Sequence, residues 1–317
     1  MKTPEVLIIG AGAIGCYFGG RLAQAGAEVS VVARSDYDFV RKNGYQIHSI
    51  DGDFHFVPAG VYRSAAEYPG EADYILIAVK ALPCVDLVEM VRPAMKEKTA
   101  ILLIQNGIDI ELALHNAFPD HCFLSAVAYI GVGRTGPGEL SHQGGGSLSV
   151  GTFPPAPAAS ESRIRELAAL FEATPVKFND EDNIVLKRWY KLLWNVPFNT
   201  LAVLAGCIDT QTLIQDQYLA NLAERMMREV VAVANATGNP LAESDIQQNM
   251  EYTRSFPPYK PSMLLDYEAH RPMEVEAILG NVIRIADRVK IEVPQLKTVY
   301  AILRMIDVQN VKKGSRK

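Results

Sequence analysis

The chain has 317 residues, of which 49% are hydrophobic and 21% charged, and its formal net charge is −5. This balance is typical of a soluble globular protein with two domains or one large one, and the lack of a basic excess argues against nucleic acid as a partner. Its four cysteines form no C-x-x-C pair and have no histidines at ligand spacing, which argues against a disulfide framework and a metal site. No apolar stretch approaches the roughly 18 residues that span a bilayer, and the N-terminal residues do not resemble a signal peptide. We therefore expect a cytoplasmic protein with no membrane partner.

Short apolar runs alternate with helical patterns as far as about residue 178. Continuous apolar runs bounded by turn residues are typical of strands that a parallel sheet buries on both faces. Helical patterns at Leu82–Val91 and Ile110–Ala117 lie between some of these runs. The alternation predicts an α/β fold with a Rossmann-type, doubly wound parallel sheet. The predicted strands are Val6–Ile9, Val29–Ala33, Tyr74–Val79, Ala100–Ile104 and Phe123–Ala128.

Two segments interrupt this alternation. Gly44–Val57 has alternating residues around Asp51-Gly52, which predicts a hairpin. Gly131–Gly151 is rich in glycine and predicts a second antiparallel excursion. A last strand near Val176–Phe178 closes the pattern, so we place an NADP-binding domain at residues 1–180.

From Ile184 onward the sequence has helical periodicity and no further strand signal. Gly238, followed by Asn-Pro, predicts the end of one helix. Ser244, with Gln247 three residues later, predicts the N-terminal cap of the next. We therefore predict an all-helical substrate domain at residues 181–317. Its helices are expected at 184–205, 217–236, 243–254, 274–289 and 295–308.

A G-x-G-x-x-G motif lies between the first predicted strand and a helix, which is the context that makes this common pattern informative. Gly10 permits a tight turn, Gly12 lets the backbone approach a pyrophosphate, and Gly15 lets the helix pack closely on the strand. The free N–H groups of the helix N-terminus would face the phosphates. These features predict that a nicotinamide dinucleotide binds to Gly10, Ala11, Gly12, Ala13, Ile14 and Gly15.

The residues after the second strand indicate which dinucleotide this is. NAD-binding proteins usually carry an acidic residue there for the ribose hydroxyls, whereas this chain has Arg34 and Ser35, which suit a 2′-phosphate. Asp36 or Asp38 could still bind the ribose, and Arg34 could be an ordinary surface residue. The pattern favours NADPH or NADP as the cofactor, with NAD as the less favoured alternative.

Two polar residues follow predicted strands directly. Lys80 comes after Tyr74–Val79, and Asn106 comes after Ala100–Ile104 and one glutamine. Because ligands of open α/β sheets bind at the carboxyl ends of the strands, we expect both to lie at the site. The alternatives are a lysine that reaches solvent and an Asn-Gly turn with no ligand.

Lys191, Asn195 and Asn199 are spaced four residues apart and share one face of a predicted helix. The residues around them are mostly apolar or aromatic, so these polar side chains must be hydrogen-bonded in the core or line a pocket. Because a lysine is rarely buried for structural reasons alone, we favour a site. Pro197 removes one helical N–H and predicts a kink.

Together these motifs resemble the ketopantoate reductases (2-dehydropantoate 2-reductases) over nearly the whole chain. The resemblance implies NADPH-dependent reduction of a 2-keto acid to the 2-hydroxy acid, in the pathway to pantothenate and coenzyme A. It rests on the glycine motif, Arg34, Lys80-Ala81, Gln105-Asn106-Gly107, Lys191-x3-Asn195-x3-Asn199, and Ser262 followed by Glu274, Glu276 and Gly280.

The resemblance also implies roles for individual residues. Lys191 matches the lysine that donates a proton to the developing alkoxide, and Glu274 a glutamate that positions substrate and cofactor. The substrate-binding positions are matched by Asn106, Asn195, Asn199 and Ser262. Asp209 stands where some members carry a further asparagine, and Trp194 makes the lysine helix bulkier than expected. Glu274 follows Pro272 and has an alternative role as a carboxylate at a helix N-terminus.

Other functions remain as alternatives to the reduction of 2-dehydropantoate. One is an NADP-dependent reductase of another small 2-keto acid. Dehydrogenases of hydroxyisobutyrate or opines are disfavoured by Asn195, Ser262 and Glu274. A redox sensor that binds NADP without catalysis would not need these polar residues. The sequence also leaves a homodimer open.

Overall fold

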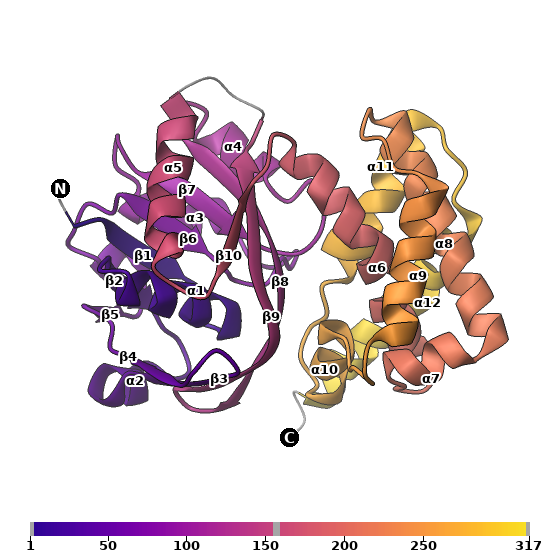
Figure 1. Ribbon diagram of the computed structural model, residues 1–317, viewed down its shortest axis with the longest axis horizontal. Helices are drawn as coiled ribbons and strands as arrows, with labels where there is room; N and C mark the ends of the chain where they lie inside the picture. The colour runs from indigo at the N-terminus through magenta and orange to yellow at the C-terminus, as the bar shows by residue number, and fades with distance from the viewer. Residues whose placement is uncertain (1–2, 155–158, 315–317) are drawn as a thin grey trace. The chain divides into compact units, whose positions relative to one another are not determined.

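The computed structural model describes residues 3–154 and 159–314, and the chain divides into two compact units (Figure 1). Two short segments that lie early in the chain belong to the second unit. The first unit consists of Met1–Lys80, Val85–Gln105 and Glu111–Ile184; the second consists of Ala81–Cys84, Asn106–Ile110 and Val185–Lys317.

The first unit is built on a ten-stranded mixed sheet with the strand order β4-β3-β9-β8-β7-β6-β1-β2-β5, and β10 pairs with β9. The strands are β1 (Glu5–Ile9), β2 (Glu28–Val32), β3 (Tyr45–Ser49), β4 (Phe54–Phe56), β5 (Val61–Tyr62), β6 (Tyr74–Ile77), β7 (Ala100–Ile104), β8 (Phe123–Gly136), β9 (Glu139–Thr152) and β10 (Lys177–Asp180). The helices of this unit are α1 (Ala13–Gln24), α2 (Tyr37–Asn43), η1 (Ala65–Glu67), α3 (Leu87–Val91), η2 (Arg92–Ala94), α4 (Leu112–Ala117) and α5 (Ala159–Glu172).

The centre of the sheet is parallel, as the apolar runs predicted. Strands β2, β1, β6, β7 and β8 pair in parallel, and every residue of β6 and β7 is buried. Helices α1 and α5 contact each other and pack on the sheet, and α3 contacts α4; Figure 1 shows α5 crossing in front of the strands. A strand covered on both faces needs apolar residues at successive positions, which explains why these runs do not alternate.

The two predicted antiparallel excursions are both present, and the second is larger than expected. β3 pairs with β4 around Asp51-Gly52. The strand predicted at Phe123–Ala128 does not end there but continues to Gly136, pairing in parallel with β7 and antiparallel with β9. Register shifts at three places, such as between Tyr129 and Ile130, accommodate the glycine-rich sequence. The sheet is therefore mixed and not purely parallel.

The helix predicted at Leu82–Val91 begins only at Leu87. The Asp86 carboxylate accepts a hydrogen bond from the Glu89 N–H at 3.1 Å, which caps the helix at that point. Pro83 and its neighbours precede the cap as a turn. The apolar periodicity of this segment did not reveal the cap, so the predicted start was wrong.

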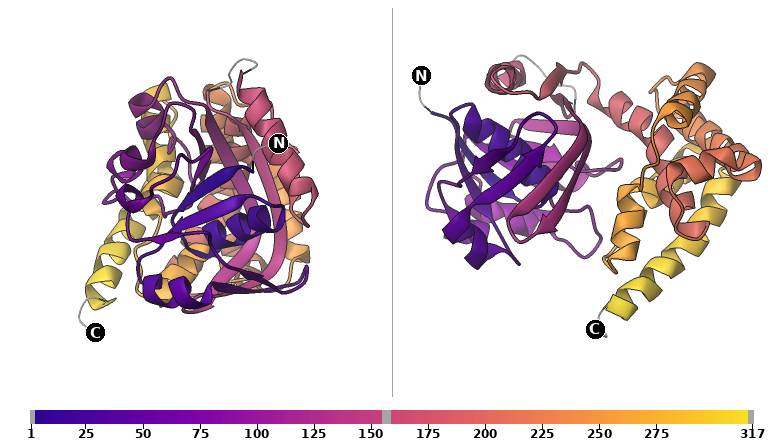
Figure 2. Two further views of the ribbon diagram at one scale, coloured as in Figure 1. Left: turned by 90° about the vertical axis from the view of Figure 1, so that its left-hand side faces the viewer. Right: turned by 60° about the horizontal axis from the view of Figure 1, so that its bottom comes forward.

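The second unit is helical, as predicted. Among the described residues no helix has both the length and the apolar character needed to cross a bilayer. The long C-terminal helix α12 is drawn in yellow in both views of Figure 2. The helices are α6 (Ile184–Leu204), α7 (Thr210–Gln215), α8 (Gln217–Ala236), α9 (Glu243–Ser255), α10 (Ser262–Glu268), η3 (Glu276–Gly280), α11 (Asn281–Val289) and α12 (Pro294–Gly314).

Details of these helices depart from the sequence analysis. The short helices α7 and α10 were not predicted. The expected Ser244–Gln247 cap is wrong, because α9 begins at Glu243 and the Asp245 carboxylate accepts from the Ala242 N–H at 2.7 Å. The helix predicted at 274–289 starts with a π-helical turn, η3. Gly238 does follow the end of α8, with φ +79°.

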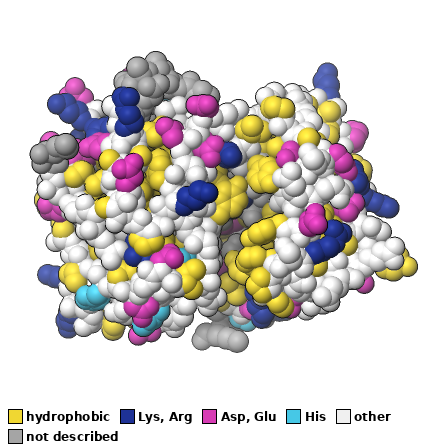
Figure 3. Space-filling view, in the orientation of Figure 1, with side chains coloured by type: hydrophobic (Ala, Val, Ile, Leu, Met, Phe, Trp, Pro, Cys, Tyr) yellow, Lys and Arg dark blue, Asp and Glu magenta, His cyan; other side chains and the backbone are white. Residues whose placement is uncertain are grey.

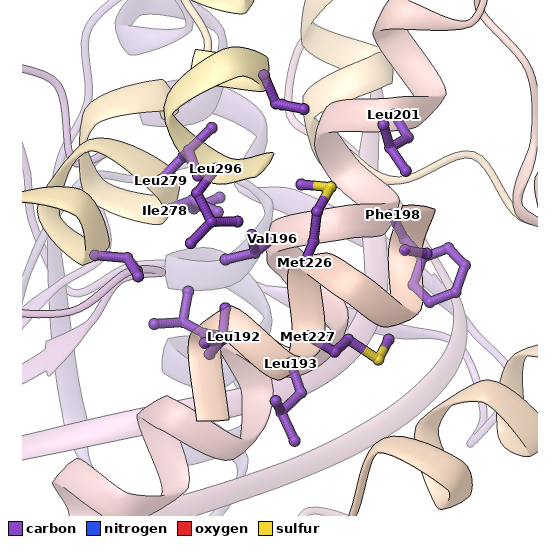
Figure 4. Packing of buried hydrophobic residues seen from close by; sticks show 14 of the residues in the cluster. Leu192, Leu193, Val196, Phe198, Leu201, Met226, Met227, Ile278, Leu279 and Leu296 are labelled. Carbon is purple, nitrogen blue, oxygen red and sulfur yellow. The ribbon is translucent and has the colours of Figure 1, made fainter. Parts of the chain in front are cut away.

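The core of the second unit anchors α6. Figure 4 shows Leu192, Leu193 and Val196 of α6 packed with Met226 and Met227 of α8, beside side chains of η3 and α12. Fully burying such a side chain contributes about 1.5–3 kcal/mol. The apolar residues of α6 therefore hold this helix against the other helices of the unit.

Candidate active site

The three motif glycines have three different environments in the first unit. Gly10 has φ +101°, and a Cβ there would lie 2.4 Å from the Val79 nitrogen. A Cβ on Gly15 would lie 2.4 Å from the Gly10 carbonyl oxygen. By contrast, apart from Gly12 itself and its neighbours along the chain, no described atom comes within 4 Å of the place where a Cβ of Gly12 would stand. Gly10 and Gly15 therefore satisfy packing requirements, whereas the space at Gly12 can admit a ligand.

The N-terminus of α1 provides hydrogen-bond donors beside this space. Gly12 is the N-cap and has no side chain to accept from the first turn, where Ala13 and Ile14 begin the helix. Ala11 lies in the turn that joins β1 to α1. Free N–H groups and the helix dipole favour an anion at such a terminus. The residues present thus fit the pyrophosphate of a dinucleotide.

The end of β2 bears on the choice between NADP and NAD. Arg34 is exposed there. The Asp36 carboxylate is buried, pairs with Arg134, and accepts from the Gly138 N–H at 3.1 Å. Although burial alone would raise its pKa, the hydrogen bonds to Asp36 hold the pKa below the ordinary value. Asp38 pairs with Arg63 at 3.3 Å. Both alternative ribose ligands are thus engaged within the unit. The Ser35 hydroxyl is engaged as well, because it donates to Asp36 at 2.8 Å, so Arg34 stays the candidate for a 2′-phosphate.

Lys80 lies three residues beyond β6 and is partly buried. The neighbouring strand ends are tied together, because the Gln105 side chain donates to the Val79 carbonyl at 2.6 Å. Lys80 is the last residue of the first unit before the segment Ala81–Cys84, which belongs to the second unit. Its predicted role in binding the cofactor remains a prediction.

In the second unit, hydrogen bonds join residues from four distant parts of the sequence. The Lys191 Nζ donates to the Asn106 Oδ1 at 2.7 Å. The Asn106 Nδ2 donates to a Glu274 carboxylate oxygen at 3.4 Å, and the other oxygen accepts from the Ala81 N–H at 2.9 Å. We call Lys191, Asn106, Glu274 and the Ala81 N–H the lysine array. The sequence pointed to its three side chains separately, and the structure brings them together.

The segment Asn106–Ile110 is fixed to the helices, and this fixes Asn106. The Ile108 N–H donates to the Ala277 carbonyl at 3.2 Å, and the Asn281 side chain donates to the Ile108 carbonyl at 2.6 Å. Gly107 has φ +109°, and a Cβ there would lie 2.5 Å from the Ala277 oxygen. The Asn-Gly dipeptide is therefore a turn, as one alternative held, and it also presents Asn106 to Lys191.

Ala277, the acceptor for Ile108, belongs to the π-helical turn η3, which begins two residues after Glu274. Single π turns inside helices are rare and often occur at functional sites. Here the turn provides the Ala277 carbonyl that anchors the segment Asn106–Ile110, and it follows Glu274 closely in the sequence. The alternative role of Glu274, a carboxylate at a helix N-terminus, does not account for its hydrogen bonds with Asn106 and Ala81.

The surroundings of Lys191 change its titration. Burial, reinforced by the positive charge of Arg188, lowers the pKa of Lys191 from 10.5 to about 8, although the Glu274 carboxylate opposes this shift. A lysine with this pKa exchanges its proton near neutral pH far more readily than a surface lysine. A lysine in this environment is suited to donating a proton near neutral pH.

The other polar residues of α6 lie farther along the same face. Asn195 is buried, and Asn199 accepts at Oδ1 from the Met263 N–H at 3.0 Å and from the Ser262 hydroxyl at 3.3 Å. The Asn199 side chain thus caps α10 and orients Ser262. α6 continues through Pro197 to Leu204.

The two departures from the family pattern have structural explanations. The Asp209 carboxylate caps α7 by accepting from the Thr212 N–H at 2.8 Å. Trp194 donates from its ring nitrogen to Thr253 at 3.0 Å, and its ring centroid lies 5.2 Å from that of Phe198 and 6.2 Å from that of Tyr259. On the face shown in Figure 3, apolar side chains gather near α9 and α10.

The sequence analysis missed two groups that act on the lysine array, the Ala81 N–H and Arg188. The Ala81 N–H could not be predicted, because a backbone donor does not depend on the type of residue. Arg188 was overlooked, although a cation three residues before Lys191 in an otherwise apolar helix was a usable signal. Within the part of the chain that the structure describes, no group of three histidine, cysteine or acidic side chains could hold a metal ion.

Comparison with known proteins gives the family. The sequence profile described as Ketopantoate reductase PanE/ApbA matches residues 6–155, and its C-terminal counterpart matches residues 183–307. A 2-dehydropantoate 2-reductase of Nostoc sp. is 30% identical over 312 residues, which cover 98% of this chain and 97% of that protein.

Solved structures agree over both units. The crystal structure of a 2-dehydropantoate 2-reductase from Methylococcus capsulatus has a TM-score of 0.90 at 42% identity, covering 96% of this chain and 97% of that one. One from Geobacter metallireducens has a TM-score of 0.89 at 33% identity, covering 95% and 99%. A D-mandelate dehydrogenase, at 20% identity and a TM-score of 0.86, shares the fold. The chain therefore belongs to the ketopantoate reductase family of pyridine-nucleotide-dependent oxidoreductases.

Proposed function

We propose that this chain catalyses the NADPH-dependent reduction of 2-dehydropantoate to pantoate, on the pathway to pantothenate and coenzyme A. The observation that carries the proposal is the lysine array, in which Asn106 holds the Nζ of Lys191 at 2.7 Å. Family membership supplies the reaction class. The array supplies a proton donor suited to that class, which the glycine motif alone would not.

The cofactor is assigned to the residues that the sequence motifs indicate. The backbone from Gly10 to Gly15 and the N-terminus of α1 would hold the pyrophosphate, and Arg34 the 2′-phosphate. Lys80 and Asn106 are assigned to the nicotinamide end. When bound, NADPH supplies the hydride that adds to the keto carbon.

Lys191 acts as the general acid. Its ammonium group donates a proton to the oxygen that gains negative charge as the keto group is reduced, and it stabilises that charge as it forms. Asn106 restrains the ammonium, and Glu274 restrains Asn106. Asn195, Asn199 and Ser262 are assigned to the substrate, with Ser262 directed by Asn199. The pKa of about 8 makes the proton available near neutral pH.

The test is an assay of NADPH oxidation by the purified protein with 2-dehydropantoate. We expect steady oxidation that depends on both compounds. An inert protein would sink the proposed activity, and oxidation without the keto acid would indicate a different reaction.

One observation favours a second candidate, the reduction of another small 2-oxo acid. Trp194 on α6, the helix of Lys191 and Asn195, and the nearby Tyr259 form a partly exposed aromatic pair, whereas Phe198 beside Trp194 is fully buried. Aromatic surfaces suit a planar or branched apolar substituent. A higher kcat/KM with an aromatic 2-oxo acid such as phenylpyruvate than with 2-dehydropantoate would select this candidate. The non-catalytic redox sensor is disfavoured by membership in a family of reductases.

The homodimer stays a prediction. A ketopantoate reductase from Staphylococcus aureus that matches this fold is described as dimeric, at 23% identity and a TM-score of 0.78. Sedimentation velocity at micromolar concentration will give the mass of this chain in solution. A mass of twice the monomer is the result that the prediction requires.

A further inference from the structure

Arg188 is a buried cation that the proposed reaction does not yet use. Its residue is 2% exposed, and its Nη1 donates to the Gly107 carbonyl at 3.3 Å. Burying a guanidinium is costly unless it is paired or hydrogen-bonded, so its place in the core of α6 needs a compensating contact. One such contact is the hydrogen bond to Gly107, the residue that follows Asn106.

Arg188 is linked to both partners of the shortest hydrogen bond in the lysine array, to one through a neighbouring backbone group and to the other through its charge. Along α6 it precedes Lys191 by three residues, a spacing that makes two side chains neighbours on a helix surface. Through Gly107 it holds the backbone next to Asn106, whose Oδ1 accepts from Lys191. One side chain thus contacts the segment that carries the acceptor, and its charge acts on the donor.

The two charges that act on Lys191 come from different elements. Arg188 lies on α6, and Glu274 lies in the segment before η3. The positive charge of Arg188 lowers the pKa of Lys191, in addition to the larger effect of burial, and the negative charge of Glu274 raises it. Asn106, which contacts Lys191 directly, is neutral.

We propose that Arg188 is a positioning residue that fixes Asn106 against Lys191 and, by its charge, makes Lys191 a ready proton donor. The proposal rests on the proposed role of Lys191 in reducing a 2-oxo acid. Because a general acid works best when it releases its proton near the working pH, a fixed cation beside the ammonium favours transfer to the substrate oxygen. The Gly107 contact keeps the acceptor in place at the same time.

The test measures the titration of Lys191 directly and its effect on turnover. With lysine labelled with ¹³C at Cε, an NMR titration gives the pH at which Lys191 is half protonated, its midpoint. The signal that disappears in Lys191→Arg identifies the residue. In Arg188→Met the midpoint should rise by at least about half a pH unit, because a neighbouring like charge is lost. The alkaline limb of kcat/KM should move to higher pH by the same amount, since Lys191 then stays protonated longer.

Two further variants separate charge from contact. Arg188→Lys keeps the charge and loses the planar fork, so the midpoint should stay near the wild-type value while kcat falls about tenfold as Asn106 loses its restraint. Arg225→Met removes an exposed charge from α8 and should change neither quantity. If Arg188→Met fails to fold by circular dichroism, Arg188→Gln replaces it with the same expected rise.

An unchanged Lys191 midpoint in the folded, uncharged variant would overturn the proposal, as would an equal shift in Arg225→Met. A wild-type protein that reduces no 2-oxo acid with NADPH would instead contradict the proposed function. The NMR midpoint in the same samples would still decide whether Arg188 acts on Lys191. The two failures are therefore distinguishable.

Discussion

The glycine motif and the lysine array reach functional geometry by opposite routes. The motif uses six consecutive residues and works through backbone shape, since Gly10 and Gly15 have no room for a Cβ and Gly12 faces open space. The array uses residues 81, 106, 191 and 274 and works through side-chain hydrogen bonds. A contiguous backbone motif can be recognised in a short stretch of sequence, whereas a site assembled from distant segments depends on the fold. In the proposed function, the motif binds a cofactor that many families bind, and the array carries the specific chemistry.

The largest expected effect comes from removing the proton donor. Lys191→Ala should lower kcat with 2-dehydropantoate by roughly 10²–10⁴-fold, because general acid catalysis is lost. NADPH affinity, measured by fluorescence titration, should be almost unchanged, since the glycine motif lies in the other unit. Activity close to wild type would show that another group donates the proton.

The next test separates the glycines within the motif. Gly12→Val should weaken NADPH binding by more than about tenfold, because its side chain fills the space assigned to the ligand. It should lower the melting temperature less than Gly15→Ala does, since only the poorer N-cap costs stability. Gly15→Ala should instead lower stability by about 1–3 kcal/mol, because its Cβ meets the Gly10 carbonyl. Thermal melts and binding titrations on both variants check the pair. Equal loss of stability in the two variants would contradict the distinction.

A smaller effect is expected at the end of β2. Arg34→Gln should lower the preference for NADPH over NADH about tenfold, since a charge-assisted contact with the 2′-phosphate is worth about 1.5 kcal/mol or more. Arg225→Gln, at an exposed position on α8, serves as the charge-matched control. A preference that Arg34→Gln leaves intact would mean that the 2′-phosphate is held elsewhere.

The smallest expected effect is a shift in pH dependence. Wild-type kcat/KM should fall as the pH rises through about 8, because Lys191 must be protonated to act. Glu274→Gln removes the charge that raises the pKa of Lys191, so the alkaline limb should move to lower pH. Glu276→Gln, whose carboxylate is held by Arg284 and Tyr300, should leave the limb in place. A shift to higher pH in Glu274→Gln would contradict the assigned electrostatics.

Much of the fold could be predicted because it rests on local patterns. The central strands were visible as apolar runs. Both ends of α8 were predicted correctly, because its helical periodicity stops just before Gly238. The extension of β8 was not visible, since glycines such as Gly131 and Gly133 indicate a loop and are held in a strand only by pairing with β9. The late start of α3 depended on a cap at Asp86 that competed with apolar periodicity.

The candidate site was predictable residue by residue but not as an arrangement. The four-residue spacing placed Lys191, Asn195 and Asn199 on one face of a helix, and Asn106 and Glu274 came from strand position and family resemblance. Their hydrogen bonds depend on η3, a π turn with no simple sequence signature, and on Asn281, which holds the Ile108 carbonyl. These are tertiary contacts that periodicity does not encode.

The central claim is that this chain reduces 2-dehydropantoate with NADPH. It is tested most directly by measuring kcat/KM for a panel of 2-oxo acids, each with NADPH and with NADH. The account predicts the highest value for 2-dehydropantoate with NADPH. A higher value for another 2-oxo acid, a preference for NADH, or no turnover with any member of the panel would contradict it.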